Sequence, residues 1–143
     1  MSRYLVVTHQ TALSRELQRK VTALIAEDPS AEFAVLVPDE PGLALTWEGE
    51  TVDEARHRAE AARALLEEAA HARVFRTAVG ASEPLRAIAD ELAEHPGYDT
   101  LVICTLPPGI SRWLKLDLVH RAERRFGVRV IHVVAEATAK ARP

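Results

Sequence analysis

Short apolar runs alternate along the chain with longer segments of helical periodicity. Consecutive apolar residues are typical of strands that are buried on both faces of a parallel sheet. Five runs rich in valine, isoleucine and leucine fit this description: Tyr4 to Thr8, Phe33 to Val37, Val74 to Val79, Leu101 to Cys104 and Val128 to Val134. The pattern therefore predicts five strands, several of them apolar on both faces.

The segments between these runs repeat apolar residues every three or four positions, as amphipathic helices do. They extend over Leu13 to Leu24, Val52 to Ala69, Leu85 to Leu92 and Leu114 to Phe126. Strands joined through helices run parallel, and right-handed crossovers place helices on both faces of the sheet. The alternation predicts a single α/β domain, residues 1–143, with a doubly wound five-stranded parallel sheet.

Capping residues indicate where three of the helices begin. Thr51 with Glu54 forms a capping box at the head of the second helix. Ser82, just before Glu83-Pro84, is a start for the third, and Ser111 is a cap for the fourth.

One long irregular stretch, Pro38 to Glu50, follows the second strand. Loops of this length are often lids or binding loops, and an exposed Trp47 would suit that role. The alternative is that Trp47 covers the edge of the sheet.

Composition narrows the class of protein. With 143 residues, 48% hydrophobic and 27% charged, the chain has enough apolar residues for one globular domain. No apolar run reaches the length of a membrane span, and the start lacks a signal-peptide pattern, so a soluble, cytoplasmic protein is expected. The lone Cys104 excludes a disulfide within the chain, and we expect it to be a small core residue.

The net charge of -3 gives no general affinity for nucleic acid or for anionic lipid. Basic residues do gather near the fourth helix, at Arg112, Lys115, Arg121, Arg124, Arg125 and Arg129. We expect them to form a solvated helix face, since no aromatic platform accompanies them, and nucleic-acid binding is not expected. Asp117 and Arg121 are expected to form an exposed ion pair within that helix.

Three segments resemble those of a known family. Gly80-Ala-Ser-Glu-Pro-Leu-Arg-Ala-Ile88 resembles Gly-Asp-Pro-x-x-x-Ile, Tyr98 to Cys104 resembles Ala-Asp-Leu-Ile-Val-Met-Gly, and Phe126 to Val134 resembles Cys-Pro-Val-Leu-Val-Val. With the order of elements, they make the sequence similar to a universal stress protein domain over nearly its whole length. The resemblance implies the strand order 3-2-1-4-5.

The glycine motif of the ATP-binding branch of that family is missing. Gly-x2-Gly-x9-Gly-(Ser/Thr), placed with Cys104 at its first glycine, falls on Cys104, Pro107, Asp117 and Leu118. A proline lacks the amide donor that a phosphate cradle uses, and an aspartate repels phosphate. The family's first-strand aspartate is His9 here. The resemblance therefore supports the fold, whereas these residues argue against the family's usual mode of ATP binding.

Ligands of open parallel sheets bind outside the carboxyl ends of the strands, where the strand order reverses. In the implied order this crevice lies between the first and fourth strands. The candidate ligand-binding residues there are Thr8, His9, Gln10, Thr11, Gly80, Ser82, Thr105, Gly109, Ser111 and Arg112. The loop from Thr105 to Arg112 ends at a helix amino terminus that favours an anion, although a proline-glycine turn with a serine cap is also a simple strand-to-helix connection.

These features predict a non-enzymatic domain for small-ligand binding, or for signalling in a stress response. No obligatory cofactor is predicted, and the expected ligand class is a nucleotide or another small anion. The alternative is a small α/β enzyme that acts on a nucleotide or phosphate ester, with His9 as a base near the Thr105 to Arg112 loop. No metal site is predicted, because the histidines His57, His71, His95 and His120 lack ligand spacing and are expected at the surface.

The last strand should lie at an edge of the sheet, where an apolar strand favours pairing with another chain. The resemblance implies a homodimer through this strand. Its interface residues would be Val128, Val130, Ile131, His132 and Val133. The alternative is that Arg129 and His132 prevent another strand from pairing with this edge. Binding of a different protein partner is also possible on this reasoning.

Overall fold

Five parallel strands form one sheet in the order β3-β2-β1-β4-β5. The computed structural model describes residues 2–9, 11, 14–38, 48–108 and 111–135. The strands are β1 (Arg3–Val7), β2 (Glu32–Pro38), β3 (Val74–Gly80), β4 (Thr100–Thr105) and β5 (Arg129–Val134). The predicted sheet and strand order are confirmed, and β3 and β5 are its two edges.

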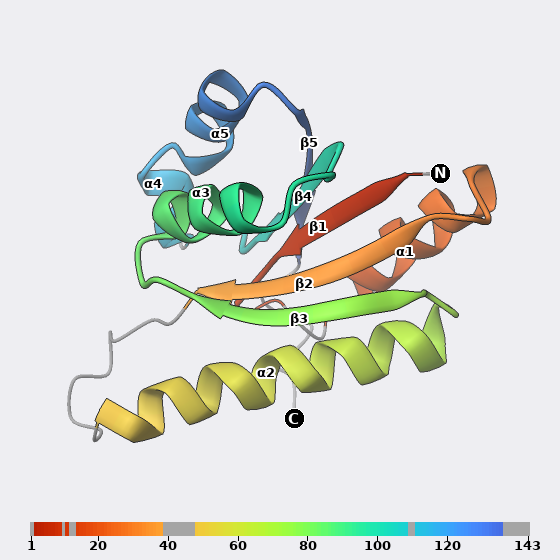
Figure 1. Ribbon diagram of the computed structural model, residues 1–143, viewed down its shortest axis with the longest axis horizontal. Coiled ribbons are helices and arrows are strands. Elements are labelled where there is room, and N and C mark those ends of the chain that lie inside the picture. Colours follow the sequence, from red (N-terminus) through yellow and green to blue (C-terminus); the bar gives the residue numbers. More distant parts are fainter. Residues whose placement is uncertain (1, 10, 12–13, 39–47, 109–110, 136–143) are drawn as a thin grey trace.

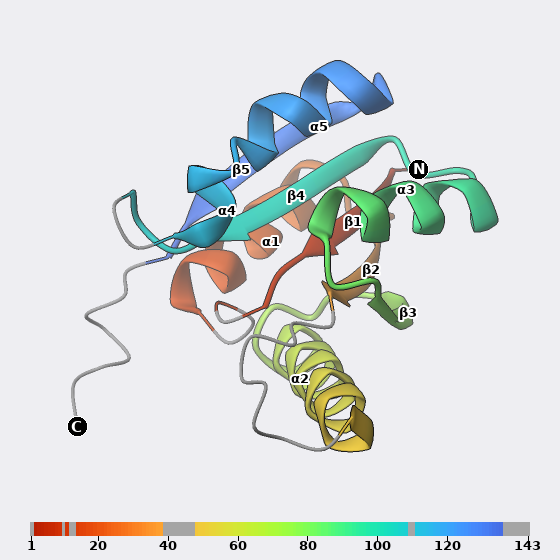
Figure 2. The same cartoon turned by 90° about the vertical axis from the view of Figure 1, so that its left-hand side faces the viewer.

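Helices cover both faces of this sheet (Figure 1, Figure 2). On one face lie α1 (Arg15–Glu27) and α2 (Glu48–Ala69). On the other lie α3 (Pro84–Glu94), α4 (Arg112–Lys115) and α5 (Leu118–Phe126). The fold is therefore doubly wound, as the alternation of strands and helices predicts.

Two apolar cores sandwich the sheet because successive side chains of a strand point to opposite faces. In β1, Val6 belongs to the core beneath α1 and α2, whereas Leu5 and Val7 belong to the core beneath α3 and α5. All three are fully buried. Burial of each such side chain contributes about 1.5–3 kcal/mol relative to exposure, so the consecutive apolar positions hold both helical layers on the sheet.

Two of the predicted helix starts are wrong by a few residues. The second helix begins at Glu48 rather than at the predicted Thr51, so it extends further toward the amino end than the sequence pattern indicates. The cap of α3 is Glu83 rather than Ser82, because Pro84 occupies the first helical position and the cap directly precedes it. The Glu83 carboxylate accepts a hydrogen bond from the Arg86 amide at 2.8 Å.

The predicted fourth helix is broken into α4 and α5. Between them, Asp117 has left-handed backbone angles, with φ 58° and ψ 40°, and Leu116 is 47% exposed. The apolar period continues from Leu114 to Leu118 across the break, so the sequence pattern does not reveal it. The predicted Ser111 cap is confirmed, since its hydroxyl accepts from the Leu114 amide at 3.1 Å.

The predicted Asp117–Arg121 ion pair is wrong, because the break redirects both side chains. The Asp117 carboxylate hydrogen-bonds to Nδ1 of His120 at 2.9 Å and lies 3.9 Å from the Arg124 guanidinium. Arg121 instead donates to the carbonyl of Leu116 at 3.2 Å. Polar side chains thus bind the exposed turn to the first residues of α5.

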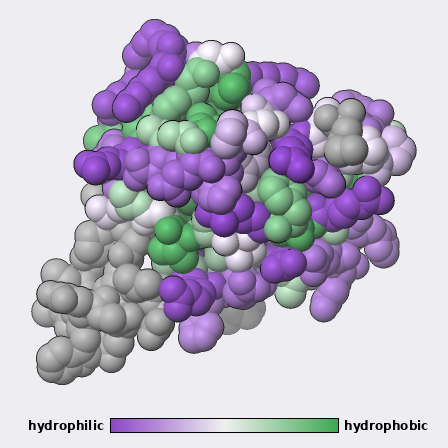
Figure 3. Space-filling view, in the orientation of Figure 1, coloured by the Kyte–Doolittle hydropathy of each residue, from purple (hydrophilic) through white to green (hydrophobic). Residues whose placement is uncertain are grey.

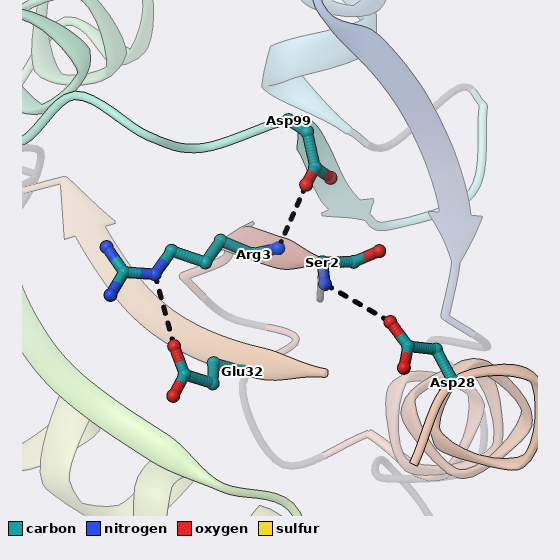
Figure 4. Close-up of polar contacts among 5 residues, drawn as sticks. All are labelled: Ser2, Arg3, Asp28, Glu32 and Asp99. Atoms are coloured by element: carbon teal, nitrogen blue, oxygen red, sulfur yellow. Dashed lines mark hydrogen bonds and ion pairs between the residues drawn. The ribbon is translucent and has the colours of Figure 1, made fainter. Parts of the chain in front are cut away.

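Three carboxylates hold the start of the chain against the sheet and α1 (Figure 4). The Ser2 amide donates to Asp28 at 3.1 Å, the Arg3 amide donates to Asp99 at 3.0 Å, and the Arg3 Nε donates to Glu32 at 3.1 Å. Hydrogen bonds from Ser30, together with those from Ser2, lower the pKa of Asp28 to about 2. The first strand is therefore anchored at its amino end, opposite the predicted crevice.

A buried carboxylate joins α3 to the edge strand β3. Glu91 is 4% exposed and accepts two hydrogen bonds from the Arg76 guanidinium, at 2.7 and 3.1 Å. The Tyr98 hydroxyl donates to the same carboxylate at 2.9 Å. Burial alone would raise the pKa of Glu91, but these donors outweigh it and lower that pKa, while burial raises the pKa of Tyr98.

The surface mixes polar and apolar residues. On the face that Figure 3 shows, hydrophilic side chains separate the hydrophobic ones among the coloured residues. Within the described parts of the chain, no helix is both long and apolar enough to cross a membrane.

Candidate functional site

The strand order reverses between β1 and β4, which are neighbours in register from Tyr4 and Thr100 to Val7 and Ile103. From β1 the chain winds outward through β2 to β3, then returns to β4 and continues to β5. The connections that leave the two central strands therefore diverge at their carboxyl ends. This is the position at which open parallel sheets bind ligands.

Two predicted ligand residues at the end of β1 are buried. Thr8 is 0% and Thr11 is 4% exposed. Their hydroxyls lie 2.8 Å apart, and the Thr11 hydroxyl donates to the carbonyl of Cys104 at 3.0 Å. These hydroxyls tie the β1–α1 connection to the end of β4 instead of lining an open rim.

Ser14 and Cys104 extend this cluster under the start of α1. The Ser14 hydroxyl accepts from the Leu17 amide at 3.2 Å, as an N-cap, and lies 3.7 Å from the Cys104 sulfur. Burial raises the pKa of Cys104, which is 1% exposed. The prediction that Cys104 is a core residue is confirmed.

A second polar pair lies at the end of β4. The hydroxyl of Thr105 and Nε2 of His132, on β5, are 2.8 Å apart. Burial lowers the pKa of His132, and its electrostatic interaction with His120 lowers it further. Sequence reasoning missed this pair, although register offers a signal: His132 is opposite Ile103, which makes it the diagonal neighbour of Thr105.

Three other candidate ligand-binding residues have structural roles or positions that could not be predicted from their residue types. A Cβ on Gly80 would lie 2.6 Å from the Cβ of Ala87, so this glycine lets α3 approach β3 closely. Ser111 is 3% exposed and caps α4. Ser82 is exposed between β3 and α3.

The accessible part of the described crevice is therefore small. His9, two residues after the end of β1, is half-exposed. Leu106 and Pro107, which follow β4, are half-exposed as well. Gln10 and Gly109 lie outside the described residues, as do Trp47 and the side chain of Arg112. The assignment of the crevice to ligand binding stays a prediction.

The remaining histidines lie at the surface, as predicted. His57, His71 and His120 are exposed, and His95 is half-exposed. Among the described residues, no group of three or more histidine, cysteine, aspartate or glutamate side chains is placed to hold a metal ion.

Solved structures share this arrangement of strands and helices. The universal stress protein from Archaeoglobus fulgidus matches with a TM-score of 0.63 and 19% identity, over 93% of this chain and 93% of its own. A universal stress protein in complex with cAMP matches with a TM-score of 0.52 and 22% identity, over 94% of this chain and 97% of its own. The fold is that of the universal stress proteins. No protein-family model matches the sequence, and no curated protein does.

The likeness to universal stress proteins extends over almost the whole chain, so all five strands belong to the shared fold. At 19% and 22% identity it is a likeness of fold, and the side chains at the end of β4 differ from the family's glycine motif. The chemistry of this site therefore depends on this chain's own residues.

Proposed function

We propose that this chain is a non-enzymatic domain of universal-stress-protein type that binds a small nucleotide-like anion and works in signalling or a stress response. The observation that supports the proposal is the fold: the strand order reverses between β1 and β4, which is where open parallel sheets bind ligands, and a protein solved with cAMP shares this fold. We place it in the cytoplasm, where a lone reduced thiol such as Cys104 is normal.

Four residues occupy the positions of the family's glycine motif, and they do not suit the way in which that family holds ATP. They support a ligand that is smaller than ATP. Cys104 is buried and Leu118 is 2% exposed within the core beneath α5, so neither presents a backbone cradle to solvent. Pro107 lacks an amide donor. Asp117 is already bonded to His120 and would repel a polyphosphate.

The half-exposed His9 and the exposed Ser82 are the described polar side chains through which such a ligand would be held. Imidazole and hydroxyl groups both donate hydrogen bonds to phosphate oxygens. Because Thr8, Thr11 and Ser111 use their hydroxyls internally, they shape the crevice and keep its walls rigid.

Calorimetric titration of the full chain with AMP, cAMP, a cyclic dinucleotide and ATP tests this function. We expect saturable binding of at least one monophosphate or cyclic nucleotide, and weaker binding of ATP. His9→Ala should lower the affinity about tenfold, the loss of one charge-assisted hydrogen bond. His57→Ala, an exposed change on α2, is the matched control and should leave it unchanged.

Two results would refute the proposal. One is the absence of heat with all four nucleotides at millimolar concentration. The other is ATP binding more tightly than AMP and cAMP, which would restore the family's polyphosphate mode.

We also propose that the chain forms a homodimer through β5. This strand is an edge of the sheet, and Val128, Val130 and Ile131 are half-exposed on or beside it, while Val134 is 39% exposed. Val133 is buried and would support the strand from the core, whereas His132 is exposed on the strand and also hydrogen-bonds Thr105. Apolar side chains along an unpaired strand edge favour pairing with a second copy.

Sedimentation of Val134→Lys tests the dimer, since paired strands would place two such lysines near each other. We expect wild type to be dimeric at micromolar concentration and the variant to be largely monomeric. Leu116→Lys changes another exposed apolar residue, in the turn between α4 and α5, and should remain dimeric. A monomeric wild type would rule the dimer out.

A further inference from the structure

A groove runs along the outer side of α1, where this helix meets the end of α2. Its volume is about 360 Å³, and it is open to solvent along its length. Both helices lie on the same face of the sheet (Figure 1). The lining residues are Arg15, Gln18, Arg19, Thr22, Ala23, Ala26 and Ala69.

Apolar groups form most of this groove. Ala23, Ala26 and Ala69 expose only methyl groups, and all three are exposed to solvent. The Thr22 hydroxyl donates its proton to the carbonyl of Gln18 at 2.9 Å, so it has no further proton to donate into the groove. Small side chains at this surface let the backbone of a second helix come close.

Two arginines at one end of the groove have no partner among the described residues. Arg15 and Arg19 are exposed and stand four residues apart, on the same side of α1. Elsewhere, Arg3, Arg63 and Arg76 each pair with a carboxylate. The groove therefore offers two free guanidinium groups beside an apolar floor.

We propose that this groove binds an acidic amphipathic helix of a partner protein. Carboxylates four residues apart on that helix would pair with Arg15 and Arg19, and its small apolar side chains would pack on the alanines. From Arg15 to Ala26 the groove is about 17 Å long, which is about three turns of helix. An open groove of this shape would leave most of a small molecule in water, whereas a helix covers its full length.

Charge also sets the direction of the bound helix. The exposed Glu27 follows Ala26 at the far end of the groove and would repel acidic residues there. The acidic end of the partner helix therefore lies at Arg15. Arg15 directly follows Ser14, which contacts the end of β4, but none of the groove's lining residues is a candidate ligand residue of the crevice between β1 and β4. The proposal does not depend on nucleotide binding.

The test uses two synthetic helical peptides of fifteen residues, built from alanine and leucine. One carries glutamates four residues apart near one end, and the other carries lysines at the same positions. Each is titrated into the isotope-labelled full chain, and amide shifts are followed by NMR. We expect saturable shifts with the glutamate peptide, confined to α1 and the end of α2.

Charge reversal and steric filling should each weaken this binding. Arg15→Glu with Arg19→Glu should lower the affinity for the glutamate peptide at least about tenfold, since two attractive pairs become repulsive. Arg73→Glu with Lys115→Glu changes the net charge equally at exposed positions outside the groove and should leave the affinity unchanged. Ala23→Trp should abolish binding by occupying the groove, while circular dichroism shows an intact fold.

Four results would overturn the proposal. The first is equal binding of the lysine peptide, and the second is shifts centred outside the groove. The third is Ala23→Trp binding as well as wild type, which would leave only a charged patch. The fourth is a change in the protein's own sedimentation on reversal of Arg15 and Arg19, which would make a second copy the occupant.

Discussion

Replacement of Gly80 by alanine separates a packing role from the ligand role that sequence reasoning assigns to it. The new Cβ would lie 2.6 Å from the Cβ of Ala87 and 3.1 Å from Cδ1 of Leu36. Non-bonded carbon atoms have their optimal separation at about 3.5–4.0 Å, so α3 must move away from β3 by roughly 1 Å. Overpacking of this kind costs about 1–3 kcal/mol, and the entropy gained by removing a strand glycine offsets at most about 1 kcal/mol. We expect a net loss of about 1–2 kcal/mol in the free energy of unfolding.

Urea denaturation measures this loss of stability. A double-mutant cycle tests whether the loss comes from the contact between residues 80 and 87. Ala87→Gly alone costs about 1 kcal/mol as a glycine within a helix. Combined with Gly80→Ala it removes the clashing Cβ, so the double variant should be more stable than the sum of the single effects predicts. Ser82→Ala, at an exposed neighbouring position, should stay within about 0.5 kcal/mol of wild type. A fully stable Gly80→Ala variant, or strictly additive effects, would refute this reasoning.

Three further predictions concern titratable groups. Glu91→Gln should cost about 2 kcal/mol at pH 7, because the carboxylate accepts three hydrogen bonds from Arg76 and Tyr98. The folded-state pKa of Glu91 is lowered, so its contribution is complete above its ordinary pKa of 4.5 and is lost as pH falls below it. Asp28→Asn should flatten the loss of stability that wild type shows between its ordinary pKa of 3.8 and about 2. The Cys104 thiol should react with a disulfide reagent slowly in the native protein and fast in urea, because burial raises its pKa and blocks access.

Each of these predictions has a contrary outcome. A stability difference between wild type and Glu91→Gln that persists at pH 2 would mean that its ionisation is not the cause. Identical acid-denaturation profiles of wild type and Asp28→Asn would mean that Asp28 does not contribute to the pH dependence of stability. Native-state labelling as fast as that of a free thiol would contradict the buried position of Cys104.

The strands were accessible to sequence reasoning because β1, β2 and β4 are apolar at consecutive positions, and α/β chirality predicts the doubly wound sheet. Their order was implied by the resemblance to universal stress proteins. The break before α5 was not accessible, because it depends on a left-handed Asp117 held by His120 and Arg124 rather than on a glycine or proline. Helix starts were misplaced where two capping residues compete, as Ser82 and Glu83 do before α3.

The candidate site was predictable in its location and not in its chemistry. Residue types suggested that Thr8, Thr11 and Thr105 would present hydroxyls to a ligand. Their actual partners are each other, a backbone carbonyl and His132, and these contacts arise only when distant segments pack together. A hydroxyl-rich sequence at the end of a strand therefore does not distinguish a binding rim from an internal hydrogen-bond network.

Binding of a small nucleotide-like anion between β1 and β4 is the central claim, and an NMR titration of the full chain with AMP and ATP tests it most directly. The account predicts saturable amide shifts with AMP at His9, Ser82, Leu106 and Ser111, with smaller shifts for ATP. AMP shifts confined to other surfaces, or the absence of shifts at these residues at millimolar AMP, would contradict it.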